Sequence, residues 1–283
     1  MPSNILGEYK KSNRREKMIY VLYFSPNGTT LRTMKNIIEG MDAAPIYVDL
    51  AVPENRRKDY QFSPDDLVLY GTITAGMLFA CNKEIFRYIH GNGAAFAGIA
   101  MYGNGYYGVA LKQLNDRAIS AGFKVIALAA FVGQHAQAGA IAAGRPDDED
   151  AKVQREFGRK IATKKNVIDV PIPVGWSSSG LYNIIVFARQ FMQGQDYALP
   201  GFMKKKKATD ACLGCGKCSR NCPAEAIKME KKPVFNSKKC IACYRCVNEC
   251  PKHAIQCTSG LMNGIVKNFG KKFENRVEPT IVI

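Results

Sequence analysis

The chain has 283 residues, of which 47% are hydrophobic, and it carries ten cysteines and a formal net charge of +16. This length and composition exclude a disordered chain and allow one large domain or two smaller ones. No apolar run reaches the roughly 18 residues of a membrane span, and the N-terminus lacks a secretory signal, so we expect a cytoplasmic protein.

The predicted elements of the first two hundred residues alternate between strands and helices. Apolar, β-rich runs predict strands at 17–24, 46–50, 67–73, 94–103 and 124–133. Helical patterns lie between or after them, at 31–41, 82–89, 107–121 and 148–165. This alternation predicts an α/β domain whose parallel sheet is doubly wound and covered on both faces. Ligands of such sheets sit beyond the carboxyl ends of the strands.

Three loops leave the predicted carboxyl ends with suitable residues: "SPNGTT" (25–30), "GTITAGM" (71–77) and "YGNGYYG" (102–108). The first follows a strand and precedes a helix, which is typical of a phosphate cradle. Backbone N–H groups, the helix N-terminus and the hydroxyls of Ser25, Thr29 and Thr30 can surround a phosphate there. An ordinary turn, with a threonine as helix cap, is the alternative.

The stretch between the first domain and the cysteines holds two further features. Residues 180–194 are apolar with helical spacing and predict core packing or a dimer contact. The run "MKKKKATD" (203–210) predicts a solvated linker, or else a docking patch for an acidic electron carrier.

Eight of the ten cysteines fall within 39 residues, in the runs "CLGCGKCSRNCP" (212–223) and "CIACYRCVNECP" (240–251). Cysteines of a reducing compartment point to metal rather than to disulfides. Both runs read C-x2-C-x2-C-x3-C-P, a spacing in which the fourth cysteine ligates the other cluster of a two-cluster ferredoxin. Structural zinc, which more often uses separated C-x2-C pairs, is the alternative.

This spacing predicts two [4Fe–4S] clusters. One is assigned to Cys212, Cys215, Cys218 and Cys250, and the other to Cys240, Cys243, Cys246 and Cys222. Cys81 and Cys257 lie outside the pattern, and we expect both to be thiols without a metal.

Residues 208–260, including "DACLGCGKC" and "PVFNSKKCIACYRC", closely resemble a bacterial-type two-cluster ferredoxin. The three loops look like the FMN site of flavodoxins. The segments "YFSPNGTT", "MYGNGYYGVAL", "AFVGQHA" and "IAAGRPDDEDAKVQREFGRKIA" resemble fused flavodoxin–ferredoxin proteins, the iron–sulfur flavoproteins of anaerobes. The resemblance implies a flavodoxin-like domain at 18–170, a connector at 171–207, a small α+β ferredoxin domain at 208–260 and a C-terminal tail at 261–283.

The same resemblance implies non-covalently held FMN. By position, the phosphate would be held by Ser25, Asn27, Gly28, Thr29 and Thr30, although many relatives have a threonine where Asn27 stands. One edge of the isoalloxazine would lie against Thr74, Ala75 and Gly76. The other wall would be formed by Tyr102, Gly103, Asn104 and Tyr107, with a tyrosine stacked on the ring.

The resemblance implies an electron-transfer protein that relays electrons between FMN and two low-potential clusters and converts two-electron into one-electron steps for a protein redox partner. Because residues 201–283 carry a net charge of +11, we expect that partner to be acidic, such as a ferredoxin, a flavodoxin or a reductase. A flavin-dependent reductase of a small substrate is the alternative. Nothing resembles a nucleic-acid recognition helix, so no nucleic acid partner is expected. A head-to-tail homodimer stays open.

Two further residues have two interpretations each. His135 is either a proton donor to reduced flavin or a domain-interface contact, or else a hydrogen-bonded loop histidine. Arg145 either belongs to the capped start of an acidic helix or docks the ferredoxin domain.

Overall fold

The computed structural model describes residues 17–79, 81–175, 201–260 and 275–283. Its main sheet has six strands in the order β12-β7-β6-β4-β1-β2. The strands are β1 (Ile19–Tyr23), β2 (Ile46–Asp49), β4 (Leu67–Ile73), β6 (Ala95–Tyr102), β7 (Lys124–Val132) and β12 (Thr280–Val282). The first five are mutually parallel. The five strands that the sequence predicts, and the α/β class, are therefore confirmed.

The order of the parallel strands is that of a flavodoxin-like sheet. Counted along the chain, they run 2-1-3-4-5 across the sheet. The topological switch point lies at β1, because the next strand along the chain, β2, lies on one side of β1, and the one after it in the sheet, β4, lies on the other side. The loops that follow β1 and β4 consequently open at the place where such sheets bind their ligands.

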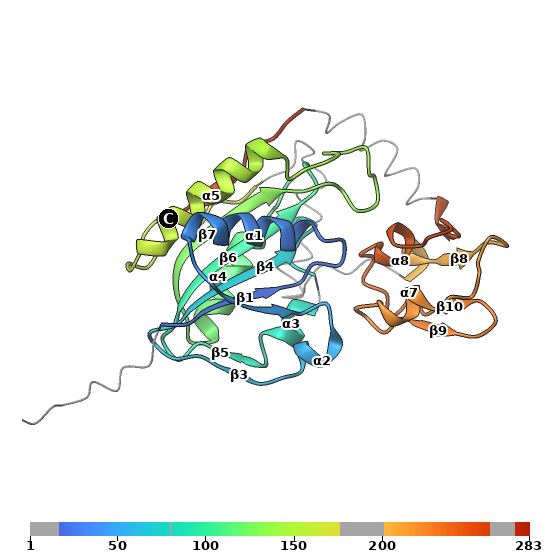
Figure 1. The fold of residues 1–283 in the computed structure, drawn as a ribbon, viewed down its shortest axis with the longest axis horizontal. Coiled ribbons are helices and arrows are strands. Elements are labelled where there is room, and N and C mark those ends of the chain that lie inside the picture. Colours follow the sequence, from blue (N-terminus) through green and yellow to red (C-terminus); the bar gives the residue numbers. More distant parts are fainter. Residues whose placement is uncertain (1–16, 80, 176–200, 261–274) are drawn as a thin grey trace, which may run out of the picture.

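Helices cover both faces of this sheet (Figure 1). Helices α1 (Thr29–Met41) and α5 (Asp148–Thr163) pack together on one face, and α4 (Ala110–Ser120) lies on the other. The remaining elements of this domain are α2 (Pro53–Arg56), α3 (Cys81–Ile85) and the parallel pair β3 (Tyr60–Gln61) and β5 (Ile89–His90). The helix expected at 82–89 ends early because residues 86–88 form a turn and Ile89 joins that pair.

Two buried apolar clusters fill the spaces between the sheet and its helices. Successive strand residues point to opposite faces, so Val21 lies in the cluster under α1 and α5 while Leu22 lies in the other. Helices α1 and α5 approach closely at two glycines. A Cβ on Gly40 would lie 2.0 Å from the carbonyl oxygen of Arg155, and one on Gly158 would lie 2.0 Å from that of Ile37.

The C-terminal residues differ from the separate tail that the sequence suggests. Strand β12 pairs antiparallel with β7, with Thr280 opposite Ala130, and Val282 is buried in the core of the first domain. The physical reason is the edge of the sheet, because β7 is apolar and buried after Lys124 and β12 covers the edge that would otherwise be free. The second domain thus lies in the chain between two parts of the first.

The second domain is small and is built from short elements. Its elements are a 3-10 turn (Gly201–Lys204), β8 (Lys206–Ala208), α7 (Lys217–Arg220), β9 (Ile227–Met229), β10 (Pro233–Phe235), α8 (Arg245–Asn248) and β11 (Ile255–Cys257). Strand β9 pairs with β10 and β8 pairs with β11, both antiparallel. The expected linker at 203–210 therefore contains a strand of the domain, and Lys204 and Lys206 are buried in it.

The predicted apolar helix at 180–194 lies outside the described residues. Within the described part of the chain, no helix is both long enough and apolar enough to cross a membrane.

Candidate cofactor sites and their interface

The loop after β1 has the features of an anion cradle. It turns at Gly28, whose φ of 84° is left-handed, and α1 begins at the next residue. The Oγ of Ser25 accepts a hydrogen bond of 3.0 Å from the N–H of Leu31, which fixes the loop to the helix start. The Oγ1 of Thr30 is buried and has no hydrogen-bond partner among the described residues. An unpaired buried hydroxyl at a helix N-terminus fits an absent phosphate.

The loops after β4 and β6 meet beside this cradle. The N–H of Thr74 donates to the carbonyl of Met101 at 2.8 Å, and the N–H of Val109 donates to the carbonyl of Gly76 at 2.9 Å. Gly76 needs its φ of 76°, and a Cβ there would lie 2.6 Å from the ring of Tyr106. The fold therefore brings the predicted edge of Thr74, Ala75 and Gly76 against the predicted wall at 102–107.

The tyrosines of this wall have different surroundings. Tyr102 and Tyr107 are both buried and contact each other edge to face, with ring centroids 5.8 Å apart. Burial raises the pKa of Tyr102 to about 12. Tyr106 is only partly buried and its ring lies against Gly76. The sequence interpretation omitted Tyr106, because the string "GYY" does not tell which ring faces the core.

His135 packs against the same wall. Its ring lies so close to Gly103 that a Cβ on that glycine would be 2.4 Å from the ring. Its Nδ1 accepts hydrogen bonds from the N–H groups of Gln137 and Ala138, at 3.3 and 3.0 Å. Burial lowers the pKa of His135. The interpretation as a hydrogen-bonded loop histidine is confirmed.

Arg145 belongs to a buried ionic network rather than to the domain interface. Its guanidinium donates to both carboxylate oxygens of Asp150 and to the side-chain oxygen of Asn104. It also donates to the carbonyl of Val277, and Asn104 donates to the carbonyl of Asn275 at 2.8 Å. Asn104 is thus held by Arg145, which precedes α5, and by the segment that leads into β12.

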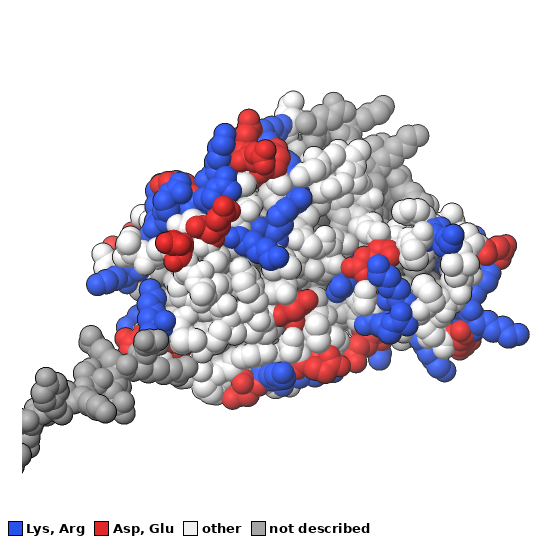
Figure 2. Space-filling model, viewed as in Figure 1, with Lys and Arg blue, Asp and Glu red and all other residues white. Residues whose placement is uncertain are grey.

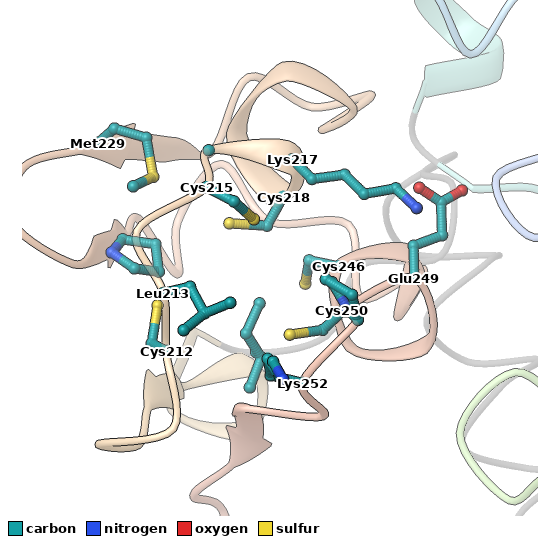
Figure 3. Close-up of a pocket in the computed structure, with 14 residues that line it drawn as sticks. Cys212, Leu213, Cys215, Lys217, Cys218, Met229, Cys246, Glu249, Cys250 and Lys252 are labelled. Carbon is teal, nitrogen blue, oxygen red and sulfur yellow. The ribbon is translucent and has the colours of Figure 1, made fainter.

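The cysteines of the second domain surround two hollows. The outer hollow, of about 440 Å³ including its mouth, is lined by Cys212, Cys215, Cys218, Cys250 and Cys246 (Figure 3). The inner hollow, of about 400 Å³, is lined by Cys222, Cys240, Cys243 and Cys246. Each hollow contains one complete predicted ligand set. Cys246 lines both, so the two hollows adjoin.

The two cysteine loops share one backbone path. In the outer loop, Gly214 and Gly216 have φ values of 66° and 74°; in the inner loop, Ala242 and Tyr244 occupy the same positions with 59° and 60°. The N–H groups of Ala226 and Ala254 likewise donate to the sulfurs of Cys222 and Cys250, both at 3.3 Å. Donors aimed at sulfur fit thiolates that carry a cluster.

Burial raises the pKa of Cys243 and Cys246 to about 12. Both thiols are therefore neutral without a metal, and binding of a cluster must release their protons.

The inner hollow faces the first domain. The side-chain amide of Asn27 donates to the carbonyl of Cys243 at 2.7 Å, and Asn248 donates to the Oδ1 of Asn27 at 3.1 Å. Arg56, which is 3% exposed, donates to the carbonyl of Pro223 at 2.5 Å, and Ile241 packs against the core of the first domain. The two domains lie side by side at this contact (Figure 1).

Comparison with known proteins agrees with the second domain. A family described as a 4Fe-4S dicluster domain matches residues 204–251. This finding favours iron–sulfur clusters over structural zinc. No similar sequence was found among curated proteins.

Solved structures similar to the first domain include two flavodoxins and an oxidoreductase. A flavodoxin from an archaeon is 17% identical, with a TM-score of 0.33, covering 51% of this chain and 96% of that chain. The two-electron reduced flavodoxin of Megasphaera elsdenii is 19% identical (TM-score 0.34, 51% and 98% covered). Rubredoxin oxygen:oxidoreductase of Desulfovibrio gigas is 14% identical (TM-score 0.38, 51% and 35% covered).

The strand order and the two cysteine hollows define the class. The molecule is an iron–sulfur electron-transfer protein in which a flavodoxin-like sheet is joined to a 4Fe-4S dicluster domain. The strand order of the first domain and the family match over residues 204–251 both agree with the resemblance to fused flavodoxin–ferredoxin proteins.

Proposed function

We propose that the chain relays electrons between FMN, held at the carboxyl ends of β1, β4 and β6, and two [4Fe–4S] clusters. When bound, FMN exchanges electrons in pairs or singly, and each cluster exchanges one. The outer cluster is held by Cys212, Cys215, Cys218 and Cys250. The inner cluster is held by Cys222, Cys240, Cys243 and Cys246. The residues at the contact between the domains determine which cluster lies next to the flavin site.

The contact between Asn27 and Cys243 carries this proposal. Asn27 belongs to the anion cradle, and Cys243 lines the inner hollow. One side chain therefore joins the loop that would hold the flavin phosphate to the backbone of a predicted cluster ligand. Since Cys246 lines both hollows, the route leads from the flavin to the inner cluster and on to the outer one.

The residues of the flavin site divide into two groups. Ser25, Thr29, Thr30 and the backbone of the 25–30 loop hold the phosphate. The buried, unpaired hydroxyl of Thr30 supports this assignment. The amide of Asn27 is engaged by the second domain, so Asn27 contributes its backbone N–H to the cradle. Tyr106, which lies against Gly76, is the tyrosine that contacts the flavin, and Tyr107 supports it from the core.

The outer cluster is the exit to a protein partner. Leu213 beside it is 68% exposed, and the sulfur-bearing Cys215 is exposed as well. Figure 2 shows blue basic side chains on this domain as well as on the first domain. The exposed lysines of this domain are Lys205, Lys207, Lys217, Lys228, Lys231, Lys232, Lys238, Lys239 and Lys252. This charge supports an acidic partner, whose encounter would slow steeply as the salt concentration rises.

An anaerobic reductive titration tests the proposal. The full-length protein is first assayed for iron, sulfide and released flavin, and we expect about eight iron atoms and one FMN per chain. Stepwise reduction should then bleach both the flavin and the clusters, and reduced protein should transfer electrons to an acidic ferredoxin. Clusters without flavin would refute the relay. Steady turnover of a small organic acceptor would favour the reductase instead.

A further inference from the structure

Lys206 points its ammonium at the inner cluster's ligands. It is a buried residue of β8, and its Nζ lies 3.5 Å from the sulfur of Cys240. The same Nζ sits 4.8 Å from the centre of the Tyr244 ring and donates to the carbonyl of Lys204 at 3.4 Å. The ammonium is therefore held by an aromatic ring, a carbonyl and a ligand sulfur.

Tyr244 is placed for this role at a conformational cost. A bulky residue with φ near 60° is uncommon, and the matching position of the outer loop is Gly216. A glycine at 244 would satisfy the loop equally well but would remove the ring beneath Lys206. The hydroxyl of Tyr244 donates to the sulfur of Cys257 at 3.5 Å, which fixes the ring from its far end.

The outer hollow has no comparable buried charge among the described residues. Lys217 and Lys252 line it, but both are exposed, so water and salt screen their charges. Figure 3 shows Lys217 extending toward Glu249, away from the sulfurs. The ammonium of Lys206, by contrast, belongs to a buried side chain and lies 3.5 Å from a ligand sulfur, so water and salt screen its charge less.

Two effects on the inner cluster oppose each other. Burial disfavours the reduced state, because reduction adds negative charge to an already anionic cluster. A fixed ammonium beside a ligand sulfur favours that state, and net charge and hydrogen bonds to sulfur are established determinants of cluster potential. At this distance the ammonium acts directly on one ligand, whereas burial of the hollow is partial, with Cys222, Cys240, Cys243 and Cys246 all retaining some exposure.

We propose that Lys206 raises the reduction potential of the inner cluster above that of the outer cluster, so that the first electron resides beside the flavin domain. This inference rests on the proposed function, because it assumes that both hollows carry [4Fe–4S] clusters. The consequence is a store of one electron at the inner cluster. Transfer onward to the outer cluster is then slightly uphill and is completed when an acidic partner withdraws the electron.

Anaerobic potentiometric titration of the full-length holoprotein with dithionite, followed by electron paramagnetic resonance, tests the inference. We expect two one-electron waves in the wild type. In Lys206→Met the reduction potential of the higher wave should fall by at least about 59 mV, which is a tenfold change in the equilibrium constant of a one-electron step. The potential of the lower wave should change less. Lys206→Arg should retain the higher wave. Lys207 is the neighbouring exposed lysine of β8, so Lys207→Met is the matched control. It should shift the potential of either wave by less than half of the shift expected in Lys206→Met.

A second measurement needs no variant and applies if Lys206→Met fails to assemble. In the wild type, paramagnetic NMR follows the β-protons of the ligand cysteines during partial reduction. Signals of Cys240, Cys243 and Cys246 that shift first support the inference, and signals of Cys212, Cys215 and Cys218 that shift first overturn it. An unmoved higher wave in an intact Lys206→Met protein also overturns it. Absence of clusters or of flavin in the initial assay would instead refute the proposed function itself.

Discussion

The two cysteine loops follow one backbone path but have different neighbours. Both take left-handed conformations at the third and fifth positions, and both end in a short helix and a cysteine before proline. At the second position, Leu213 of the outer loop is 68% exposed, whereas Ile241 of the inner loop packs against the core of the flavodoxin-like domain. A repeated motif thus supplies one cluster site at the contact with the flavodoxin-like domain and one at the surface.

The largest effect is expected when one cluster at a time is removed. Cys243→Ser should lose about four of eight iron atoms and should slow electron transfer from flavin to the remaining cluster by at least about a hundredfold, because the inner step is missing. Cys215→Ser should lose as much iron but retain rapid flavin-to-cluster transfer. Stopped-flow absorbance after iron and sulfide assay measures both.

Cys81→Ser is the control, because Cys81 lies in α3 of the first domain and lines neither hollow. Equal slowing in Cys243→Ser and Cys215→Ser would show that the inner and outer positions are not distinct. Loss of all eight iron atoms in either variant would show that the domain needs both clusters to fold, as small metal-bound domains often do.

The next largest effect concerns the buried arginine that joins the domains. Arg56→Met keeps the apolar stem but leaves the carbonyls of Pro223 and Leu50 without their donor. We expect the free energy of unfolding to fall by about 2–3 kcal/mol and flavin-to-cluster transfer to slow. Thermal unfolding followed by circular dichroism, together with stopped-flow, measures the two effects.

Arg57→Met provides the matched comparison. Arg57 is 49% exposed and pairs with the exposed Glu225, so its loss should lower the free energy of unfolding much less than the loss of Arg56 does. If the two variants were equally stable, the contact of Arg56 with Pro223 would not support the interface.

These contacts mark the limit of what the sequence could predict. The five parallel strands follow from apolar runs bounded by loops, and the two ligand sets follow from cysteine spacing, since both patterns are local. Lys206 and Arg56 were missed because their roles depend on contacts far along the chain, such as Arg56 with Pro223. In "MKKKK" nothing distinguishes a buried lysine from a solvated one. Aligning the two cysteine runs, however, places Tyr244 opposite Gly216, and that mismatch was a readable signal.

A smaller effect separates the two apolar residues at the second loop position. Leu213→Ser should weaken binding of an acidic ferredoxin by about 1 kcal/mol, roughly fivefold, and leave flavin-to-cluster transfer unchanged. Ile241→Ser should slow flavin-to-cluster transfer and leave the affinity for the acidic ferredoxin unchanged, because the Ile241 side chain contacts the flavodoxin-like core. Titration calorimetry gives the first quantity and stopped-flow the second. If Leu213→Ser left the affinity unchanged, the outer surface would not be the docking site.

The smallest expected effect decides the role of Asn27. Its side chain donates to Cys243 and accepts from Asn248, so Asn27→Ala should slow flavin-to-cluster transfer a few-fold, as expected for about 1 kcal/mol of lost hydrogen bonding. Its FMN affinity should change by less than about 0.5 kcal/mol, because the cradle keeps the backbone N–H.

Thr30→Val is the contrast, since the buried hydroxyl of Thr30 has no other partner among the described residues. That variant should bind FMN about tenfold more weakly and retain its iron. Fluorescence titration of the apoflavoprotein compares the two affinities. If Asn27→Ala lost FMN as strongly as Thr30→Val, Asn27 would serve the phosphate, and the link between cradle and inner hollow would have to lie elsewhere.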